Sequence, residues 1–194
     1  MNIGQTLISR HPTECDWVRL ATLIDTEGNL HITGKKTFDL QITVPNTDVR
    51  LPIWCQTRFG GFVCLNEYKP RHKKTYRWKA AGPLARVIIN GCFPYFISKR
   101  EQAKVCVEFA GTFTGQRADN SILDRRWLLK HRLQKERKPY DYLPVEKQLI
   151  EGGASEEEAF REAAKLADEA RRKRNKRRAN KPSDGPDHIA SPAG

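Results

Sequence analysis

Hydrophobic and polar positions alternate with two different periods along the chain. Four short segments have an apolar residue at every second position, which predicts half-buried strands. Between and after them, apolar residues recur every three or four positions, which predicts amphipathic helices. The predicted strands cover residues 29–33, 38–43, 62–68 and 75–80, and the predicted helices cover residues 13–27, 48–59, 83–91 and 98–109.

This order of elements predicts an α/β (α+β) core. Helix, hairpin, helix, hairpin and helix give the sequence αββαββα around a curved four-stranded antiparallel sheet with helices on one face. A further helix over 121–138 is expected to pack on this core. The chain is therefore expected to fold as one main domain followed by C-terminal helices.

The first predicted helix is apolar on more than one side. Leu20, Ala21 and Ile24 share one face, and Leu23 lies on another, while Thr13 is the predicted N-cap. Because the predicted sheet covers only one face, we expect the other face of the helix to meet another protein surface.

Charge changes this picture by indicating a polyanionic partner. The 194 residues include 35 Lys and Arg against 23 Asp and Glu, a formal net charge of +12. Residues 171–178 alone carry seven positive charges, so more than half of the excess lies near the C-terminus. The preceding part of the chain is basic to a smaller extent.

The composition predicts four regions. We expect an N-terminal arm over 1–12, the main domain over 13–138, a linker with a basic helical extension over 139–181, and a disordered tail over 182–194. The last helix, opened by Ser155 and reaching about Ala179, is acidic first and basic last. It is either a non-specific phosphate-binding arm or a solvated charged helix.

Cysteine usage and hydropathy indicate a soluble intracellular protein without a membrane partner. The five cysteines have no zinc-ligand spacing, and no apolar run has the length of a signal peptide or a membrane span. The expected location is the cytoplasm or nucleoid, a phage-infected cell or an organelle matrix.

Residues 20–28, Leu-Ala-Thr-Leu-Ile-Asp-Thr-Glu-Gly, place two acids at the C-terminal end of a helix. An acid there costs a few tenths of a kcal/mol or more unless a cation compensates, and a divalent metal is one such cation. In the alternative interpretation, Asp25 and Glu27 mark an ordinary helix exit, with Gly28 as a left-handed cap.

This nonapeptide resembles the signature of the LAGLIDADG homing endonucleases of the single-motif, homodimeric type. A second segment, Phe93-Pro-Tyr-Phe-Ile-Ser-Lys-Arg100, is similar to the family's Pro-aromatic segment that leads to a lysine and a helix. The resemblance implies that Glu27 and Lys99 are catalytic, that Glu27 and the carbonyl of Thr26 bind metal, and that the cofactor is Mg²⁺ or Mn²⁺. Arg50 is a candidate basic partner.

One face of the predicted sheet carries polar side chains of the types that read base edges. An antiparallel sheet can also leave such a face to water. With the resemblance, we expect this face to lie along double-stranded DNA as a β-ribbon reader. The predicted DNA-binding residues are Asn29, His31, Thr33, Asp39, Gln41, Thr43, Cys64, Asn66, Tyr68, Thr75, Arg77 and Lys79.

The resemblance implies a site-specific DNA endonuclease that makes metal-dependent double-strand breaks in a long pseudo-palindromic target. Since the chain has one copy of the motif, we expect a homodimer. Thr22 replaces a small glycine of the family and would separate the two helices unless its methyl packs outward. The predicted dimer interface consists of Leu20, Ala21, Leu23 and Ile24.

Two other functions stay open on the sequence. Relatives of this fold act as maturases that bind intron RNA without cutting DNA, and the basic extension suits that role. The third reading is an inactive, sequence-specific DNA-binding protein. Retention of both Glu27 and Lys99 favours the nuclease, because a binding module has no need of an acid facing a phosphate.

Overall fold

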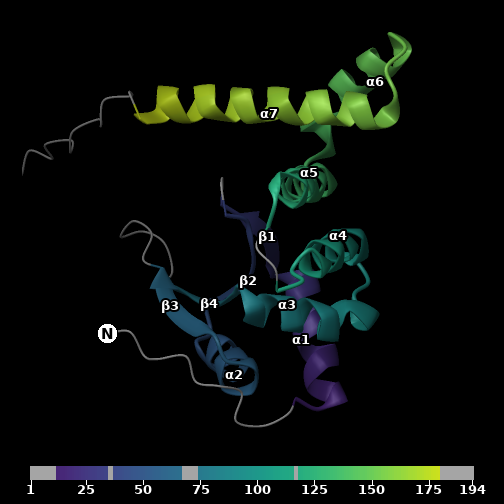
Figure 1. Ribbon diagram of the computed structural model, residues 1–194. Helices are drawn as coiled ribbons and strands as arrows, with labels where there is room; N and C mark the ends of the chain where they lie inside the picture. Colours follow the sequence, from purple (N-terminus) through teal and green to yellow (C-terminus); the bar gives the residue numbers. More distant parts are fainter. Residues whose placement is uncertain (1–11, 35–36, 67–73, 116–117, 180–194) are drawn as a thin grey trace, which may run out of the picture. The chain divides into compact units, whose positions relative to one another are not determined.

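A computed structural model describes residues 12–34, 37–66, 74–115 and 118–179 (Figure 1). The chain divides into two compact units, one ending at Pro139 and one beginning at Tyr140. The predicted DNA contact at Tyr68 and the arm before residue 12 lie outside the described residues.

The first unit is built on one antiparallel sheet with the strand order β1-β2-β4-β3. Two hairpins therefore lie side by side, with β2 and β4 in the centre. The order of helices and strands agrees with the predicted αββαββα core (Figure 1). The elements are α1 (Glu14–Thr26), β1 (Asn29–Thr33), β2 (Asp39–Asn46), α2 (Arg50–Phe59), β3 (Phe62–Asn66), β4 (Thr75–Ala81), α3 (Pro83–Cys92), the 3-10 turn η1 (Phe93–Tyr95) and α4 (Arg100–Gly111).

The core lies between one face of the sheet and the helices that cover it. Leu30, Leu40, Ile42 and Ala80 on the strands are fully buried, in agreement with the period of two. Trp78 is also fully buried, and its indole Nε1–H donates to the carbonyl of Gly60 at 2.8 Å. The opposite face of the sheet is left for polar side chains.

Helix α1 begins as predicted but faces the core differently from the prediction. Thr13 caps it in a capping box with Asp16. Leu20, Ala21 and Ile24 are fully buried in this chain's own core and keep no surface for a second copy. Their predicted place in a dimer interface is therefore corrected: the helix packs against its own domain through the face that was assigned to the partner.

Helix α3 extends one residue beyond Gly91, where the sequence predicted its end. The glycine is needed inside the helix because α1 crosses close to it. A Cβ atom at Gly91 would lie 2.7–2.8 Å from three carbons of the Trp17 ring, which in turn packs 5.0 Å from the ring of Phe59. The small residue is thus a contact between helices, not a helix stop.

Helix α5 (Asn120–Arg137) packs along α4 and β1, as expected for a helix that completes the core. Its Arg126 is buried and donates to the hydroxyl and the carbonyl of Thr112 at 2.9 and 2.8 Å. Lys130 donates to the carbonyl of Gly34 at 2.7 Å, just after β1 ends. The helix is therefore fixed to both the helical layer and the edge strand.

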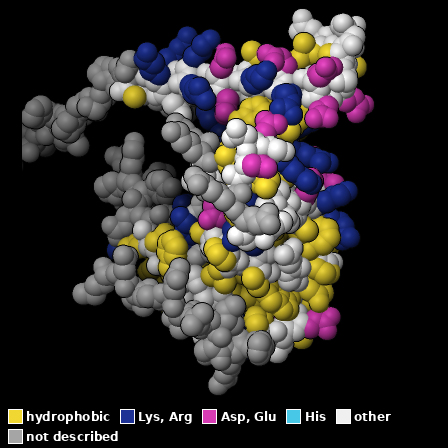
Figure 2. Space-filling model, in the orientation of Figure 1, with side chains coloured by type: hydrophobic (Ala, Val, Ile, Leu, Met, Phe, Trp, Pro, Cys, Tyr) yellow, Lys and Arg dark blue, Asp and Glu magenta, His cyan; other side chains and the backbone are white. Residues whose placement is uncertain are grey.

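The second unit begins within the short 3-10 turn η2 (Pro139–Asp141) and contains α6 (Leu143–Glu151) and α7 (Glu156–Ala179). Tyr142 is buried, with its ring 6.2 Å from that of Phe160. Ser155 and Glu158 form the predicted capping box, and the basic side chains gather at the C-terminal end of α7 (Figure 2). Helix α6 was not predicted; its residues had been assigned to a linker.

In the part of the chain that the structure describes, none of the helices combines the length and the hydropathy of a membrane span.

The Gly91 contact predicts a large effect of one methyl group. Gly91→Ala forces a methyl against the Trp17 ring, and overpacking of this kind costs about 1–3 kcal/mol. Urea unfolding should show this loss of stability. The control is Gly111→Ala, at the end of α4 with no atom within 4 Å of the added Cβ, which should be neutral or stabilising. Equal stability of the Gly91→Ala variant and the parent protein would contradict the packing.

Candidate functional site

The C-terminal end of α1 and the N-terminal end of α4 cap each other. The carboxylate of Asp25 accepts three backbone N–H groups, from Ile97 at 2.7 Å, Ser98 at 3.2 Å and Lys99 at 2.8 Å. The Lys99 ammonium donates in the other direction, to carbonyls in and after the last turn of α1. An acid thus lies at a helix N-terminus and a cation at a helix C-terminus, the placement that both helix dipoles favour.

Lys99 holds the tip of α1 with all three N–H donors of its ammonium group. It donates to the carbonyls of Ile24 at 2.6 Å, Asp25 at 2.6 Å and Gly28 at 3.0 Å. Burial lowers the pKa of Lys99, while the Asp25 carboxylate acts against that shift and Arg137 acts with it. Lys99 is therefore a cation that compensates for the acids at the C-terminal end of α1.

These contacts also determine how the two helices begin and end. The N-cap of α4 is Lys99, and the amides of Ser98 and Lys99 donate to Asp25. Gly28 is not a left-handed cap, because its φ is not positive and the C-cap residue before it, Glu27, is right-handed. Gly28 is required because a Cβ there would lie 2.6 Å from the Cα of Ile24.

Glu27 is exposed at the tip of α1 and belongs to a chain of polar contacts that runs to α2. Asn46, the last residue of β2, donates from Nδ2 to Oε2 of Glu27 at 2.8 Å and accepts the backbone N–H of Asp48 at 2.8 Å. Asp48 accepts from the Arg50 guanidinium at 2.6–3.0 Å, and these hydrogen bonds lower the pKa of Asp48 to about 2. Glu27 and Arg50 therefore belong to one network.

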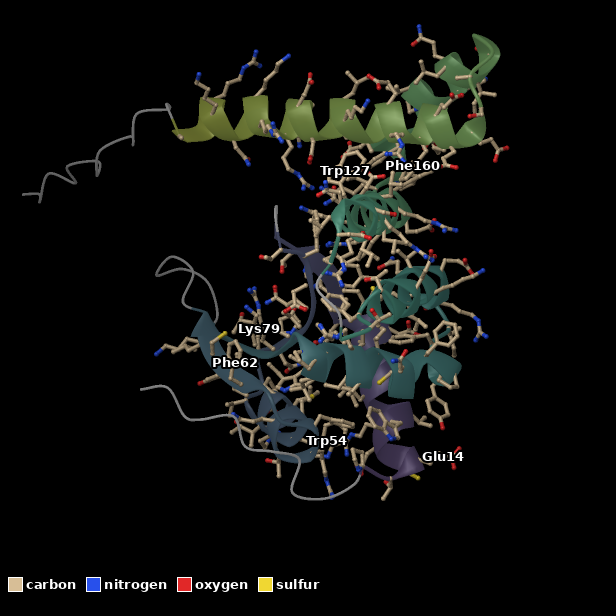
Figure 3. All side chains as sticks on the ribbon, in the orientation of Figure 1. Glu14, Trp54, Phe62, Lys79, Trp127 and Phe160 are labelled. Atoms are coloured by element: carbon tan, nitrogen blue, oxygen red, sulfur yellow. The ribbon has the colours of Figure 1, made fainter. Side chains whose placement is uncertain are left out.

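The polar face of the sheet brings the predicted DNA-binding residues into rows across the strands. Asn29, Thr43 and Lys79 pair in register, and Lys79 pairs onward with Phe62, whose ring lies 5.5 Å from the Lys79 Nζ (Figure 3). Strand registry therefore places on one face the residues Asn29, His31, Thr33, Asp39, Gln41, Thr43, Cys64, Asn66, Thr75, Arg77 and Lys79.

Several of these residues are less accessible to a ligand than the sequence suggested, because they are buried or already hydrogen-bonded. Thr43 is buried, with 7% of its surface exposed. Asp39 accepts from Nη1 of Arg86 on α3 at 3.2 Å, so its carboxylate is partly neutralised. Cys64 donates weakly to the carbonyl of Arg77 at 3.5 Å. The face that can reach a ligand is therefore more basic and smaller than the predicted set.

A residue outside the predicted set reaches this face from α5. Arg137, the last residue of that helix, lies with Nη1 2.9 Å from Nδ1 of His31 and Nη2 3.5 Å from Oδ1 of Asn29. Burial lowers the pKa of His31, and the charges of Arg137 and Arg77 add to that shift. The sequence placed Arg137 in the predicted helix over 121–138 but gave no signal that it contacts β1.

A metal ion requires several ligand groups close together. Among the described residues, no three His, Cys, Asp or Glu side chains lie close enough together to hold an ion. Burial raises the pKa of Cys55 and of Cys92 to about 12, which favours the protonated thiol at both positions. The oxygen donors at the tip of α1 fit a hard cation, since Mg²⁺ takes one or two carboxylates with phosphate oxygens and waters.

The outward face of α1 carries small branched residues. Val18 is 41% exposed, and Thr22 and Thr26 follow at four-residue spacing, both exposed. The Thr22 hydroxyl donates to the carbonyl of Val18 at 2.9 Å and the Thr26 hydroxyl to that of Thr22 at 3.0 Å. Since both hydroxyls bond within the helix, Thr22 needs no polar partner outside it.

Comparison with solved structures identifies the fold. The homing endonuclease I-CvuI, in complex with the I-CreI target and Mg, is 16% identical at a TM-score of 0.53, over 63% of this chain and 82% of that chain. I-CvuI with its own target and Ca is 18% identical over the same shares of both chains, at a TM-score of 0.52. The archaeal intron-encoded homing endonuclease I-Vdi141I, complexed with DNA, is 16% identical at a TM-score of 0.54, over 63% of this chain and 84% of that chain.

The chain therefore has the fold of the LAGLIDADG homing endonucleases, as the sequence predicted. The sequence matches no protein-family model and no curated protein.

The interlock between α1 and α4 predicts that Lys99 stabilises the fold. Lys99→Met leaves three carbonyls without their charged donor, which should cost about 1–3 kcal/mol in urea unfolding. Lys104→Met, on the exposed side of the same helix, is the matched control and should change stability by less than about 0.5 kcal/mol. Equal effects of the two substitutions would show that Lys99 does not cap α1.

Proposed function

We propose that the protein is a site-specific DNA endonuclease that makes Mg²⁺-dependent double-strand breaks as a homodimer. The observation that carries the proposal is the exposed Glu27 carboxylate, held by Asn46 at the tip of α1 beside the polar face of an endonuclease-like sheet. The structural neighbours are homing endonucleases, and those described above are complexes with DNA.

Hydrolysis of a phosphodiester needs an activated water and compensation of the charge that develops on the phosphate. Glu27 and the carbonyl of Thr26 would hold Mg²⁺ or Mn²⁺, which supplies a hydroxide at neutral pH and stabilises the developing charge. The donors of Lys99 occupy the carbonyls of Ile24, Asp25 and Gly28 and leave that of Thr26 to the metal. The two I-CvuI complexes were studied with Mg and Ca.

The other basic residues act through position and charge. Lys99 fixes the last turn of α1, and with it the direction of Glu27; a direct contact with a phosphate requires that it release at least one carbonyl. Arg50 is 88% exposed at its side chain and is linked to Glu27 through Asp48 and Asn46. It is the candidate for contact with the scissile phosphate.

A second copy completes the site. One chain gives one Glu27, so two carboxylates meet only if two α1 tips come together. The surface for that contact is the outward face of α1, with Val18, Thr22 and Thr26, beside hydrophobic side chains that are exposed on this part of the molecule (Figure 2). Ile97, next to the interlock, is 86% exposed. This arrangement replaces Leu20, Ala21 and Ile24 of the interface that the sequence predicted, because they are fully buried, and keeps the half-buried Leu23 as a candidate contact.

The basic C-terminal end of α7 is proposed to add non-specific contacts to DNA phosphates. The exposed Arg171, Arg172, Lys173 and Arg174 are grouped there, and such contacts make binding fall steeply with salt.

Glu27→Gln tests the chemistry. The substitution removes the charge that holds the metal and should reduce cleavage of a duplex selected from a randomised library by at least about a hundredfold, since metal stabilisation is worth several kcal/mol. Gel-shift binding to the same duplex should stay within a few-fold of the parent. Glu101→Gln, an exposed acid in the first turn of α4, is the control and should cut normally.

Cleavage by the Glu27→Gln variant at the parent rate would rule out this mechanism. Tight binding of duplex DNA without cleavage by the parent protein in Mg²⁺ or Mn²⁺ would instead identify a DNA-binding protein. Preference for a structured RNA over every selected duplex would identify the RNA-binding alternative.

Thr22→Glu tests the dimer. A charge on the outward face of α1 should shift the protein from dimer to monomer in sedimentation velocity and abolish double-strand cleavage. Thr57→Glu on α2 is the matched control, since Thr57 is also exposed and also bonds the carbonyl four residues before it, at 2.9 Å. A parent protein that sediments as a monomer on its DNA would contradict the shared site.

A further inference from the structure

We propose that Arg137 fixes the orientation and the tautomer of His31, so that His31 presents an N–H donor to the acceptor edge of a DNA base. The inference rests on the proposed function, because it assigns a specificity role on the DNA-facing sheet. Arg137 is thus a positioning residue, and His31 the residue that reads the base.

The contact joins the end of one helix to the edge strand of the sheet. Arg137 ends α5, and its Nη1 lies 2.9 Å from Nδ1 of His31. The same guanidinium reaches Oδ1 of Asn29, two residues earlier on the same face of β1, at 3.5 Å. Lys130, two turns earlier in α5, donates to the carbonyl of Gly34 at 2.7 Å and anchors the helix beside the strand.

The chemistry of the two partners decides the tautomer. A guanidinium carries five donors and no acceptor and stays charged, so Nδ1 of His31 must accept from it. In a neutral imidazole the proton then lies on Nε2. Burial and the neighbouring charges of Arg137 from α5 and Arg77 from β4 all lower the pKa of His31 from its usual value, which favours the neutral ring. His31 therefore offers one donor through Nε2.

A donor on this face selects a particular class of base. In the major groove, acceptors are purine N7, guanine O6 and thymine O4, whereas cytosine presents the donor N4. Asn29 turns its carbonyl toward Arg137 and so offers its amide N–H groups outward, which removes the donor–acceptor pair that adenine requires. Two donors spaced by two residues along β1 favour guanine, which has two acceptors, N7 and O6.

The proposed effect of Arg137 on the tautomer of His31 can be measured on the free, full-length protein. Nitrogen-15 NMR of histidine should show His31 with its proton on Nε2 and a titration midpoint below 6.5, with His31→Gln identifying the signals. Arg137→Met should raise the midpoint toward 6.5 and give a mixture of tautomers. Arg132→Met, on the same helix but paired with Glu108 at 3.6 Å, should leave the signals unchanged. A parent His31 protonated on Nδ1, or unchanged signals in Arg137→Met, would overturn the proposal.

The recognition part uses the non-cleaving Glu27→Gln background and a duplex chosen from a randomised library. We expect His31→Ala and Arg137→Met to lose preference for guanine at the same one or two base pairs, by about 5- to 150-fold, with other positions unchanged. The double variant should lose little more guanine preference than either single variant, because both substitutions remove the same contact. Uniform weakening over all sequences, with a shallower salt dependence, would show a phosphate contact and overturn the base assignment.

The two proposals fail in different ways. The proposed function is tested by DNA cleavage with the parent protein and the Glu27→Gln variant, and neither carries a substitution on β1. Loss of the present inference is read from the imidazole signals of the free protein and from the base preference of Arg137→Met. If the protein cuts DNA but Arg137→Met changes neither the His31 signals nor the base preference, the first proposal stands and the second is wrong.

Discussion

The exchange of charged groups between α1 and α4 is the constraint on which the rest of the site depends. Asp25 at the end of one helix serves the amides that begin the other, and Lys99 returns three hydrogen bonds to the first helix. The acid lies at the N-terminal end of α4 and the cation at the C-terminal end of α1, where the helix dipoles favour their signs, and both hydrogen-bond to backbone groups at those ends. The tip of α1, and therefore the direction of Glu27, is set by residues more than seventy positions apart in the sequence.

The interlock separates the roles of the two acids in the motif. Asp25 is structural in this arrangement, since its carboxylate is surrounded by backbone N–H groups. Glu27 is exposed and is oriented from the side by Asn46, which connects it to Asp48 and Arg50. One short segment thus provides both the anchor of a helix pair and the acid that is proposed to bind metal.

The local periods of the sequence were enough to predict the core, because strands of period two and capped helices leave clear patterns. The contacts between helices and strands could not be predicted from these local periods. The burial of Leu20, Ala21 and Ile24 depends on which helix packs against which face, and the position of Arg137 depends on how α5 crosses β1. Asn46 had the form of an ordinary turn residue, and only the fold brings it to Glu27. Helix α6 was missed because its nine residues, with a proline near the start, resemble a linker.

Under the proposed function, the alternation along the strands has a consequence for how such a protein acquires new targets. Residues that hold the domain together, such as Leu30, Leu40 and Ile42, occupy one face, and residues such as Gln41 occupy the other. A substitution on the polar face can therefore change recognition while the hydrophobic layer stays intact. Evolution or engineering can change Gln41 with little effect on the hydrophobic layer, whereas Thr43 on the same strand is buried and Asp39 is paired with Arg86 on α3. On β1, His31 is tied to α5, so a new base preference there requires coordinated change in two elements.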